Sequence, residues 1–236
     1  MQKAGRLFGI TSRMQSRVCR LIALLALVAA QSGCNAVMLL GYLIGGPPTT
    51  DPDFEVRTKQ TLAGKNKKNV VLVYCFAPKE LKWDNESVDY DIARHVADRL
   101  RENKIKVVDT DQLFAWLDNN DKWRKTAELG KQFKVDYVVH IDTKDYTLFD
   151  RSSASHYRGQ ADIVVNVVKM NDNKTDGHVI YTAPVKYVFP ARGPRDSSEI
   201  PFGEFKNHFL AALSEEIGRL FYSKQTGDEI PFGFLP

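Results

Sequence analysis

The stretch QADIVVNVVKMNDNKTDGHVIYTAPVKYVF, residues 160–189, decides the fold. Its two halves alternate apolar and polar side chains, the pattern of half-buried β-strands. The polar segment NDNKTDG at 171–177 between them favours a tight turn. Pro184 lies in the second half, and because proline cannot donate to a strand ladder, we expect this strand at a sheet edge. The stretch therefore predicts an antiparallel hairpin.

Three further segments predict strands of the same sheet. VDYVVHIDTKDYTLFD at 135–150 precedes the hairpin across the turn-like RSSAS at 151–155, which predicts an antiparallel meander of three strands. VVLVYCFA at 70–77 is a continuous run of β-branched and aromatic residues, typical of a central strand covered on both faces. IKVVDTD at 105–111 is a short strand ending in two carboxylates.

Apolar residues at helical spacing separate or follow these strands. We predict helices after Ser87, after Asp111 as an N-cap, over 122–133 and from Phe202 to Phe221. The resulting order is β-α-β-α-β-β-β-α. It predicts an α/β (α+β) domain over 68–224, with a single mixed sheet and helices packed on it.

The amino-terminal leader has the parts of a secretory signal. Five basic residues and no acidic residue precede the apolar run LIALLALVAA at 21–30, and small residues follow it. Ten apolar residues are too few to cross a bilayer, which needs about 20. Without those five residues the chain has 28 basic against 29 acidic side chains, so the predicted domain gives no electrostatic reason to expect a nucleic-acid partner.

The sequence Ser32-Gly33-Cys34 after this run resembles the lipobox of bacterial lipoproteins. The resemblance implies cleavage of a signal peptide at 1–33 and acylation of Cys34 by fatty acids such as palmitate, although Gln31 stands where the family usually has an aliphatic residue. The alternative is an uncleaved anchor over 21–46. Both place the domain outside the cytoplasmic face, because the basic residues stay inside. By the same analogy, Asn35 favours the outer membrane.

The segments on either side of the predicted domain are apolar or extended. AVMLLGYLIGG at 36–46 follows Cys34 and Asn35, and Pro47 begins an expected tether. We therefore expect 34–67 to form the lipid anchor, an apolar segment and a tether. The GYLIGGPP portion also resembles lipoproteins of planctomycete-type bacteria. The carboxy-terminal tail at 225–236 contains EIPFG at 229–233, which repeats residues 199–203. Chance or shared turn chemistry explains the repeat, or the tail docks on its own domain or a neighbour's.

The cysteines and the polar residues at strand ends are the candidate sites in this sequence. Cys34 is the proposed lipidation site, and Cys75, in an apolar strand, is expected to be an inert buried thiol. His140 and Asp142 lie two apart on one strand face, which suits an acid–base pair or a metal, and Asp109 ends a neighbouring strand. Two residues without a third partner are a weak signal. We therefore expect no catalytic residues, cofactor or metal.

The fragments KQFKVDYVVHID (131–142) and ADIVVNVVKMNDNKTDGHVIYTAPV (161–185) resemble a periplasmic α/β domain. It is shared by CsgG-like curli-secretion lipoproteins, LpoB-type activators of penicillin-binding proteins and the N-terminal domain of TolB. The resemblance implies a non-enzymatic envelope module that binds proteins.

Three functions follow from these observations. The first is a lipid-anchored binding or scaffolding module with envelope protein partners, with a homo-oligomer left open. The second is a periplasmic hydrolase using His140, Asp142 and Asp109. The third is a subunit of an export complex.

Overall fold

The computed structural model describes residues 43, 49–63, 68–83, 85–120 and 122–225. The chain divides into two units, 1–48 and 49–236, and the elements below belong to the second. Cys34 and the leader lie outside the described residues, and so does the tail beyond Gln225. Among the described helices, none has the length and apolar character needed to cross a membrane.

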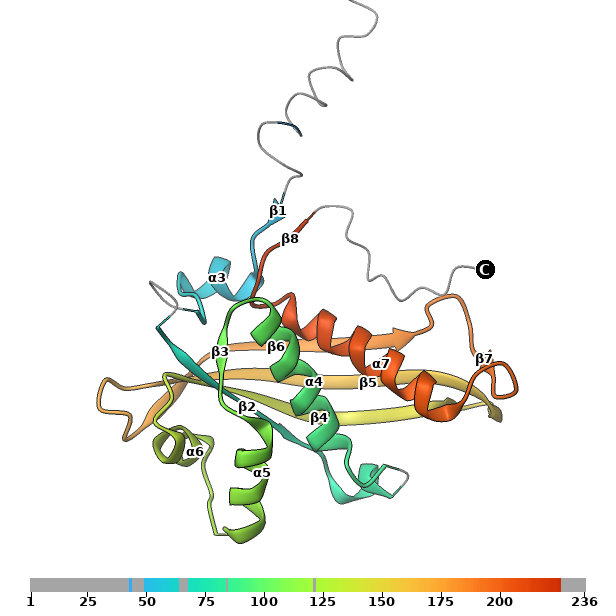
Figure 1. Cartoon of the computed structure of the whole chain (residues 1–236), viewed down its shortest axis with the longest axis horizontal. Helices are drawn as coiled ribbons and strands as arrows, with labels where there is room; N and C mark the ends of the chain where they lie inside the picture. The colour runs from blue at the N-terminus through green and yellow to red at the C-terminus, as the bar shows by residue number, and fades with distance from the viewer. Residues whose placement is uncertain (1–42, 44–48, 64–67, 84, 121, 226–236) are drawn as a thin grey trace, which may run out of the picture. The chain divides into compact units, whose positions relative to one another are not determined.

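A mixed sheet of six strands forms the centre of the second unit (Figure 1). The order is β3-β2-β4-β5-β6, and β7 pairs with β5. β2 is parallel to both β3 and β4, whereas β4, β5 and β6 form an antiparallel meander. The strands are β2 (Val70–Phe76), β3 (Lys106–Val107), β4 (Tyr137–Asp150), β5 (Ser153–Met170), β6 (Gly177–Phe189) and β7 (Arg195–Asp196).

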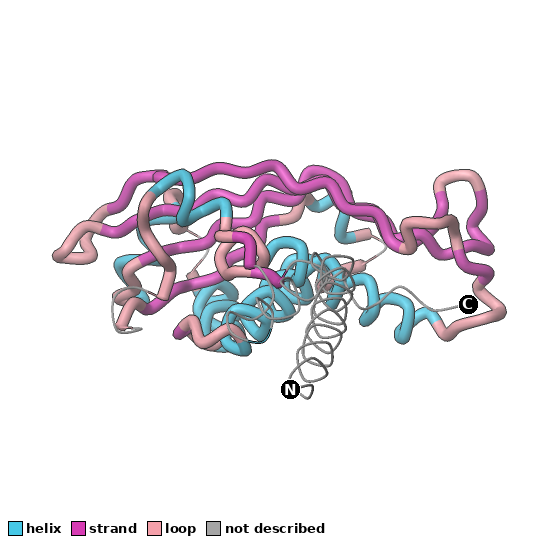
Figure 2. The backbone as a smooth tube through the Cα atoms, turned by 90° about the horizontal axis from the view of Figure 1, so that it is seen from above, coloured by secondary structure: helices cyan, strands magenta, loops and turns pink. Residues whose placement is uncertain are grey.

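Two long helices and one short helix cover one face of the sheet. These are α4 (Val88–Glu102), α7 (Phe202–Gly218) and α3 (Asp53–Thr58). Figure 2 shows helices gathered along this side of the strand layer. The main hydrophobic core lies between them and the sheet, and the inward residues of β2, β4, β5 and β6 belong to it. Two ion pairs join α4 to α7: Lys206–Asp91 at 2.7 Å and Arg99–Glu215 at 3.1 Å.

The opposite face of the sheet is covered in part. α5 (Thr110–Asn119) and α6 (Thr126–Phe133) belong to a second hydrophobic cluster with Leu72, Tyr74 and Val138 of the sheet. Beyond this cluster, half-buried and exposed residues of β4, β5 and β6 alternate with the core residues. We call this part the open face, and it includes His140 and Asp142 of β4, Val164 and Asn166 of β5, and Thr182 and Pro184 of β6.

The main features predicted from the sequence are confirmed. The chain forms one mixed sheet with helices packed on it, and the last three long strands form the predicted meander. β2 is covered on both faces, since Val71 and Val73 face one core and Leu72 and Tyr74 the other. Pro184 lies in β6, an edge strand in the sheet order.

The predicted cap at Asp111 and the predicted turn need correction. Asp109, not Asp111, is the N-cap of α5: its carboxylate accepts hydrogen bonds from the backbone amides of Asp111 at 2.8 Å and Gln112 at 3.4 Å. Asp111 accepts instead from the Tyr90 hydroxyl. The turn predicted over 151–155 is shorter, because β5 already begins at Ser153.

The prediction of an extended tether up to residue 67 is also wrong in part. Residues 53–58 form α3, whose Phe54 is fully buried in the main core. The Phe54 ring packs edge-on against Tyr181, with ring centroids 5.4 Å apart. The short strand β1 (Thr49–Thr50) pairs with β8 (Lys224–Gln225). The apolar spacing of Phe54 and the buried Leu62 is too sparse for periodicity to find this segment.

An irregularity in β4 changes which of its residues face the main core. Tyr137, Val139 and Ile141 face α4 and α7, as expected for period two. The register then shifts between Thr143 and Asp145. Because a bulge inserts one extra residue, the residues that follow change faces. Tyr146 and Leu148 consequently join the main core instead of the open face.

Candidate functional site

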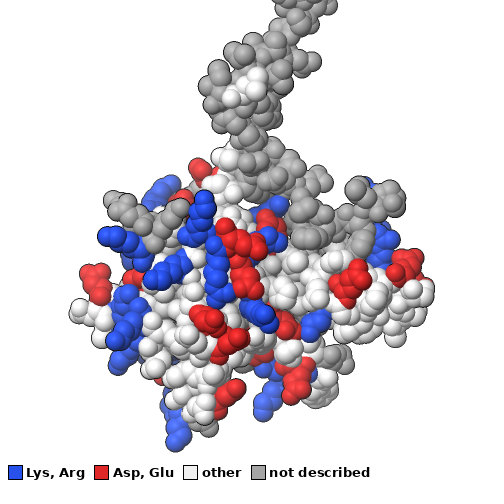
Figure 3. All heavy atoms as spheres, viewed as in Figure 1, with Lys and Arg blue, Asp and Glu red and all other residues white. Residues whose placement is uncertain are grey.

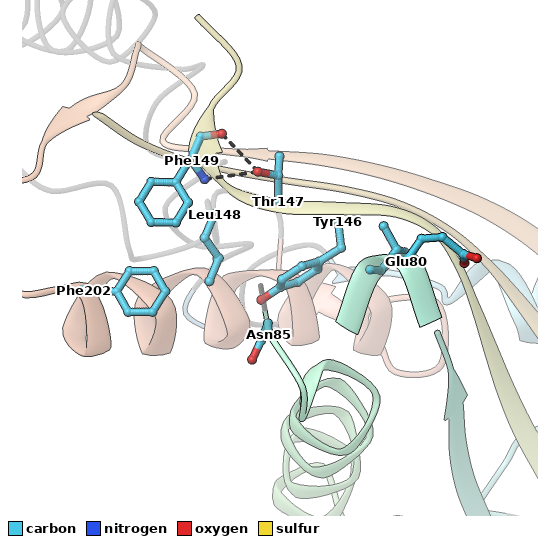
Figure 4. Close-up of a pocket in the computed structure, with 8 residues that line it drawn as sticks. Glu80, Asn85, Tyr146, Thr147, Leu148, Phe149 and Phe202 are labelled. Carbon is cyan, nitrogen blue, oxygen red and sulfur yellow. Dashed lines mark hydrogen bonds between the residues drawn. The ribbon is translucent and has the colours of Figure 1, made fainter. Parts of the chain in front are cut away.

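A small cavity lies where the end of β4 meets the start of α7 and the 3-10 helix η2 (Lys79–Lys82) (Figure 4). Its volume is about 120 Å³. We call it the aromatic pocket. It is lined by Glu80, Leu81, Asn85, Tyr146, Thr147, Leu148, Phe149 and Phe202.

Two stacked phenylalanine rings form one wall of the aromatic pocket. Phe149 of β4 and Phe202 of α7 lie nearly parallel, with centroids 5.6 Å apart and an interplanar angle of 11°. Both also contact Tyr157 of β5. They are nevertheless 36% and 38% exposed. Contact with the buried Tyr157 ring therefore holds both phenylalanine rings in place, while part of their apolar surface stays exposed to solvent.

At the inner end of the pocket, the Tyr146 hydroxyl and the Asn85 side-chain amide nitrogen are buried and have no hydrogen-bond partner among the described residues. Tyr146 is buried, and Figure 4 shows its hydroxyl directed toward Asn85. Asn85 accepts a 3.0 Å bond from Lys206 Nζ through its Oδ1, but its buried Nδ2 has no hydrogen-bond partner among the described residues. Burial raises the pKa of the Tyr146 hydroxyl, an effect to which Asp91 adds and which the Asn85 amide opposes. Tyr146 is therefore a neutral phenol at physiological pH.

The local sequence explains how these residues come together. The register shift in β4 directs Tyr146 and Leu148 toward the helices. A second shift between Thr147 and Phe149 follows, and the Thr147 hydroxyl accepts a 3.2 Å bond from the Phe149 amide. Pro201 is the N-cap residue of α7, so Phe202 begins the helix. The pocket thus depends on two irregularities in one strand and one helix start.

The pocket combines apolar walls with a buried amide donor. Such a site can take one apolar side chain and donate a hydrogen bond to a carbonyl oxygen beside it. Trp83 lies two residues after Leu81 and is 85% exposed. Exposed aromatic residues next to a pocket are typical of protein-binding surfaces.

The structure places His140 and Asp142 on the open face of β4. The His140 ring stacks on Tyr74, with centroids 5.3 Å apart, and burial lowers the pKa of His140. The Lys144 ammonium group forms an ion pair with the Asp142 carboxylate and donates a hydrogen bond to it. In the described part of the chain, no hydrogen bond joins Asp142 to His140. The two side chains share a face as predicted but do not form a bonded pair.

Asp109 is occupied elsewhere, as the N-cap of α5. No described hydrogen bond or ion pair connects it to His140 or Asp142. In the described ranges, no group of three or more His, Cys, Asp or Glu side chains is arranged to hold a metal. Cys75 is fully buried, and this burial raises the pKa of its thiol to about 12. The structure therefore does not assemble the predicted acid–base set.

The sequence pattern does not predict the residues of the aromatic pocket. Strict alternation along 135–150 places Tyr146 on the same face as His140, and only the register shift moves it. The one available signal was the EIPFG repeat, which contains Phe202. Figure 3 shows acidic and basic side chains interleaved on the face with α4 and α7.

The chain is similar to several solved structures of low sequence identity, of which three are described here. One is a PelC dodecamer of Paraburkholderia phytofirmans, with a TM-score of 0.40, 10% identity and coverage of 74% of this chain and 97% of that chain. Lipoprotein GNA1162 of Neisseria meningitidis has a TM-score of 0.39 and 11% identity, covering 62% and 99%. Protein CT253 of Chlamydia trachomatis has a TM-score of 0.38 and 18% identity, covering 65% and 91%.

The chain matches no family model, and no curated protein matches it in sequence. Similarities at TM-scores of 0.40 and below do not transfer residues or activities. The resemblance to the CsgG, LpoB and TolB group therefore stays a prediction.

Proposed function

We propose that this chain is a lipid-anchored, non-enzymatic binding module of the bacterial cell envelope. Its aromatic pocket receives an apolar side chain of a protein partner. The observation that carries the proposal is the exposed Phe149–Phe202 stack beside an unfilled cavity whose buried Asn85 Nδ2 lacks a partner. A buried donor without a partner is costly, and a ligand carbonyl would satisfy it.

The size of the cavity limits what it can hold. A cavity of about 150 Å³ accommodates one benzene molecule, and the aromatic pocket measures about 120 Å³. The space suits a single aromatic or aliphatic side chain rather than a nucleotide or an organic cofactor. Burying such a side chain contributes roughly 1.5–3 kcal/mol. The pocket therefore serves as an anchor point within a larger protein contact.

The lipid anchor is supported by the lipobox-like sequence ending at Cys34. Acyl chains on this cysteine hold the domain at a membrane surface, with the outer membrane and its periplasmic face as the proposed location. Intact-mass analysis of the protein from native membranes tests this part. The expected chain begins at Cys34 and carries fatty acyl groups; a chain that begins at Met1 with a free thiol at position 34 contradicts it.

Site-specific crosslinking tests the pocket. A photo-reactive amino acid in place of Glu80, an exposed residue at the rim, is irradiated in intact cells. We expect one discrete product that joins this chain to a second polypeptide. Phe149→Ala should reduce its yield at least fivefold.

Phe76→Ala is the matched control. It removes an aromatic ring that is 46% exposed and belongs to β2, outside the pocket lining. It should leave the crosslinked product unchanged. Equal yields in the Phe149→Ala and Phe76→Ala proteins would refute the pocket as the binding site.

A further inference from the structure

The pentapeptide EIPFG occurs twice in the chain, and its first copy builds a wall of the aromatic pocket. Ile200 is buried, Pro201 is the N-cap of α7, and Phe202 stacks on Phe149. The first copy of the pentapeptide therefore already packs against the apolar surface of the pocket, through the stacking of Phe202 on Phe149. The second copy, at 229–233, belongs to the tail that follows β8.

We propose that the second copy binds in the aromatic pocket of another molecule of this chain. The Phe232 ring occupies the cavity and extends the Phe149–Phe202 stack. This inference rests on the proposed function and names the partner: a second copy, joined through its tail. Each molecule then supplies one tail and one pocket.

The chemistry of the tail fits the pocket. The cavity holds about one aromatic ring by volume, and Phe232 supplies that ring. A residue that precedes proline is disfavoured in the helical region, so the Ile230-Pro231 sequence suits a bound peptide in an extended form. A backbone carbonyl of the tail can accept a hydrogen bond from the unpaired Asn85 Nδ2.

The reach of the tail favours a second copy over the same molecule. The pocket lies at Phe202, the first residue of α7, and this helix of 17 residues is about 25 Å long. Gln225 follows the other end of the helix (Figure 1). The seven residues from Gln225 to Phe232 span at most about 25 Å when fully extended. The tail could reach the pocket of its own molecule only when fully extended, and such extension has a large cost in conformational entropy.

A tail-to-pocket contact is heterologous, since different surfaces of the two molecules meet. Contacts of this kind build closed rings or open chains. Removing either half of the contact from every molecule abolishes assembly. Mixing molecules that lack the tail half with molecules that lack the pocket half restores exactly one kind of contact, which yields pairs and no larger species.

Complementation between two full-length variants tests the inference. Phe232→Ala removes the tail anchor, and Phe149→Ala removes the exposed ring of the pocket. Sedimentation of the detergent-extracted chains measures their mass. We expect assemblies of two or more copies in the wild type, single copies for each variant alone, and two-copy species in an equimolar mixture of the variants.

Phe234→Ala is the control within the same tail, and it should assemble like the wild type because it lies outside the repeat. Matched circular dichroism spectra check that both test variants fold. The inference is overturned if the wild type is a single copy, if Phe232→Ala assembles like the wild type, or if the mixture stays single. In the second case, loss of the Glu80 crosslink in Phe149→Ala alone would leave the proposed pocket function standing with a different partner segment.

Discussion

The Tyr181 hydroxyl on β6 donates a 2.6 Å hydrogen bond to the carboxylate of Asp53 in α3. Arg57 of the same helix lies over the Tyr181 ring, 4.7 Å from its centroid, and donates to the Thr182 carbonyl at 3.1 Å. With Phe54 buried beneath, these contacts fasten α3 to the edge strand of the sheet. The chain that leads from the proposed anchor therefore enters the folded domain through a fixed helix.

Tyr181→Phe should lower the free energy of unfolding by about 0.5–1.5 kcal/mol, because it removes the hydrogen bond to Asp53 and keeps the ring. Urea denaturation measures the change. Tyr187→Phe is the control, since no hydrogen bond of its hydroxyl is seen among the described residues, and it should change stability by less. Equal losses in the two variants would assign no role to the Asp53 contact.

The contact also predicts a dependence on pH. The hydrogen bond from Tyr181 lowers the pKa of Asp53, with Arg57 contributing in the same direction and partial burial opposing it. A lowered pKa in the folded state gives stability that is present above the unfolded pKa of about 4 and is lost as pH falls through the lower folded pKa. The difference in free energy of unfolding between the wild type and Asp53→Asn should therefore shrink as pH drops from 6 to 2. A gap independent of pH would contradict this assignment.

Asp109→Ala should destabilise the domain by about 1 kcal/mol, because it removes the side-chain cap of α5. Asp111→Ala is its matched partner in the same segment, and it should cost less because Asp111 lies in the first turn and contacts only the Tyr90 hydroxyl among the bonds described. Thermal denaturation of both variants decides between them. A larger loss for Asp111→Ala would restore the cap predicted from sequence.

Gly159→Ala should destabilise the domain by about 1–3 kcal/mol through overpacking. A Cβ at this position on β5 would lie 2.3 Å from the ring of Phe209, which is fully buried in the core. Gly130→Ala is the comparison, because its close neighbour is the sulfur of the flexible Met170 side chain, and alanine favours the helix there. Urea denaturation measures both variants, and we expect Gly159→Ala to lose more free energy of unfolding than Gly130→Ala. A larger loss for Gly130→Ala would contradict this argument.

Cys75 should resist alkylation in the folded protein. Burial raises the pKa of its thiol to about 12, and its sulfur lies 3.4 Å from the Thr143 hydroxyl, so the reactive thiolate is scarce at pH 8. Mass spectrometry after iodoacetamide treatment should show no addition in buffer and one addition in urea for the mature protein. Two additions in urea would reveal a free Cys34 and count against lipidation.

The strand β4 shows which structural features the sequence predicts and where the prediction fails. Alternation predicted the strand, its place in the meander and the shared face of His140 and Asp142. It failed beyond Thr143, because the register shift moves Tyr146 to the core face. A period of two fixes the faces of a strand only while its pairing is unbroken, and pairing depends on the neighbouring strand.

The sequence by itself determined the strand order along the chain, the doubly covered β2 and the edge position of β6, because local patterns of apolar residues and proline encode burial and hydrogen bonding directly. Only the tertiary structure decided the aromatic pocket and the docking of α3. Both depend on contacts between residues far apart in the chain, such as Phe149 with Phe202 and Asp53 with Tyr181. Such contacts are selected by packing of the whole core, which no local period records.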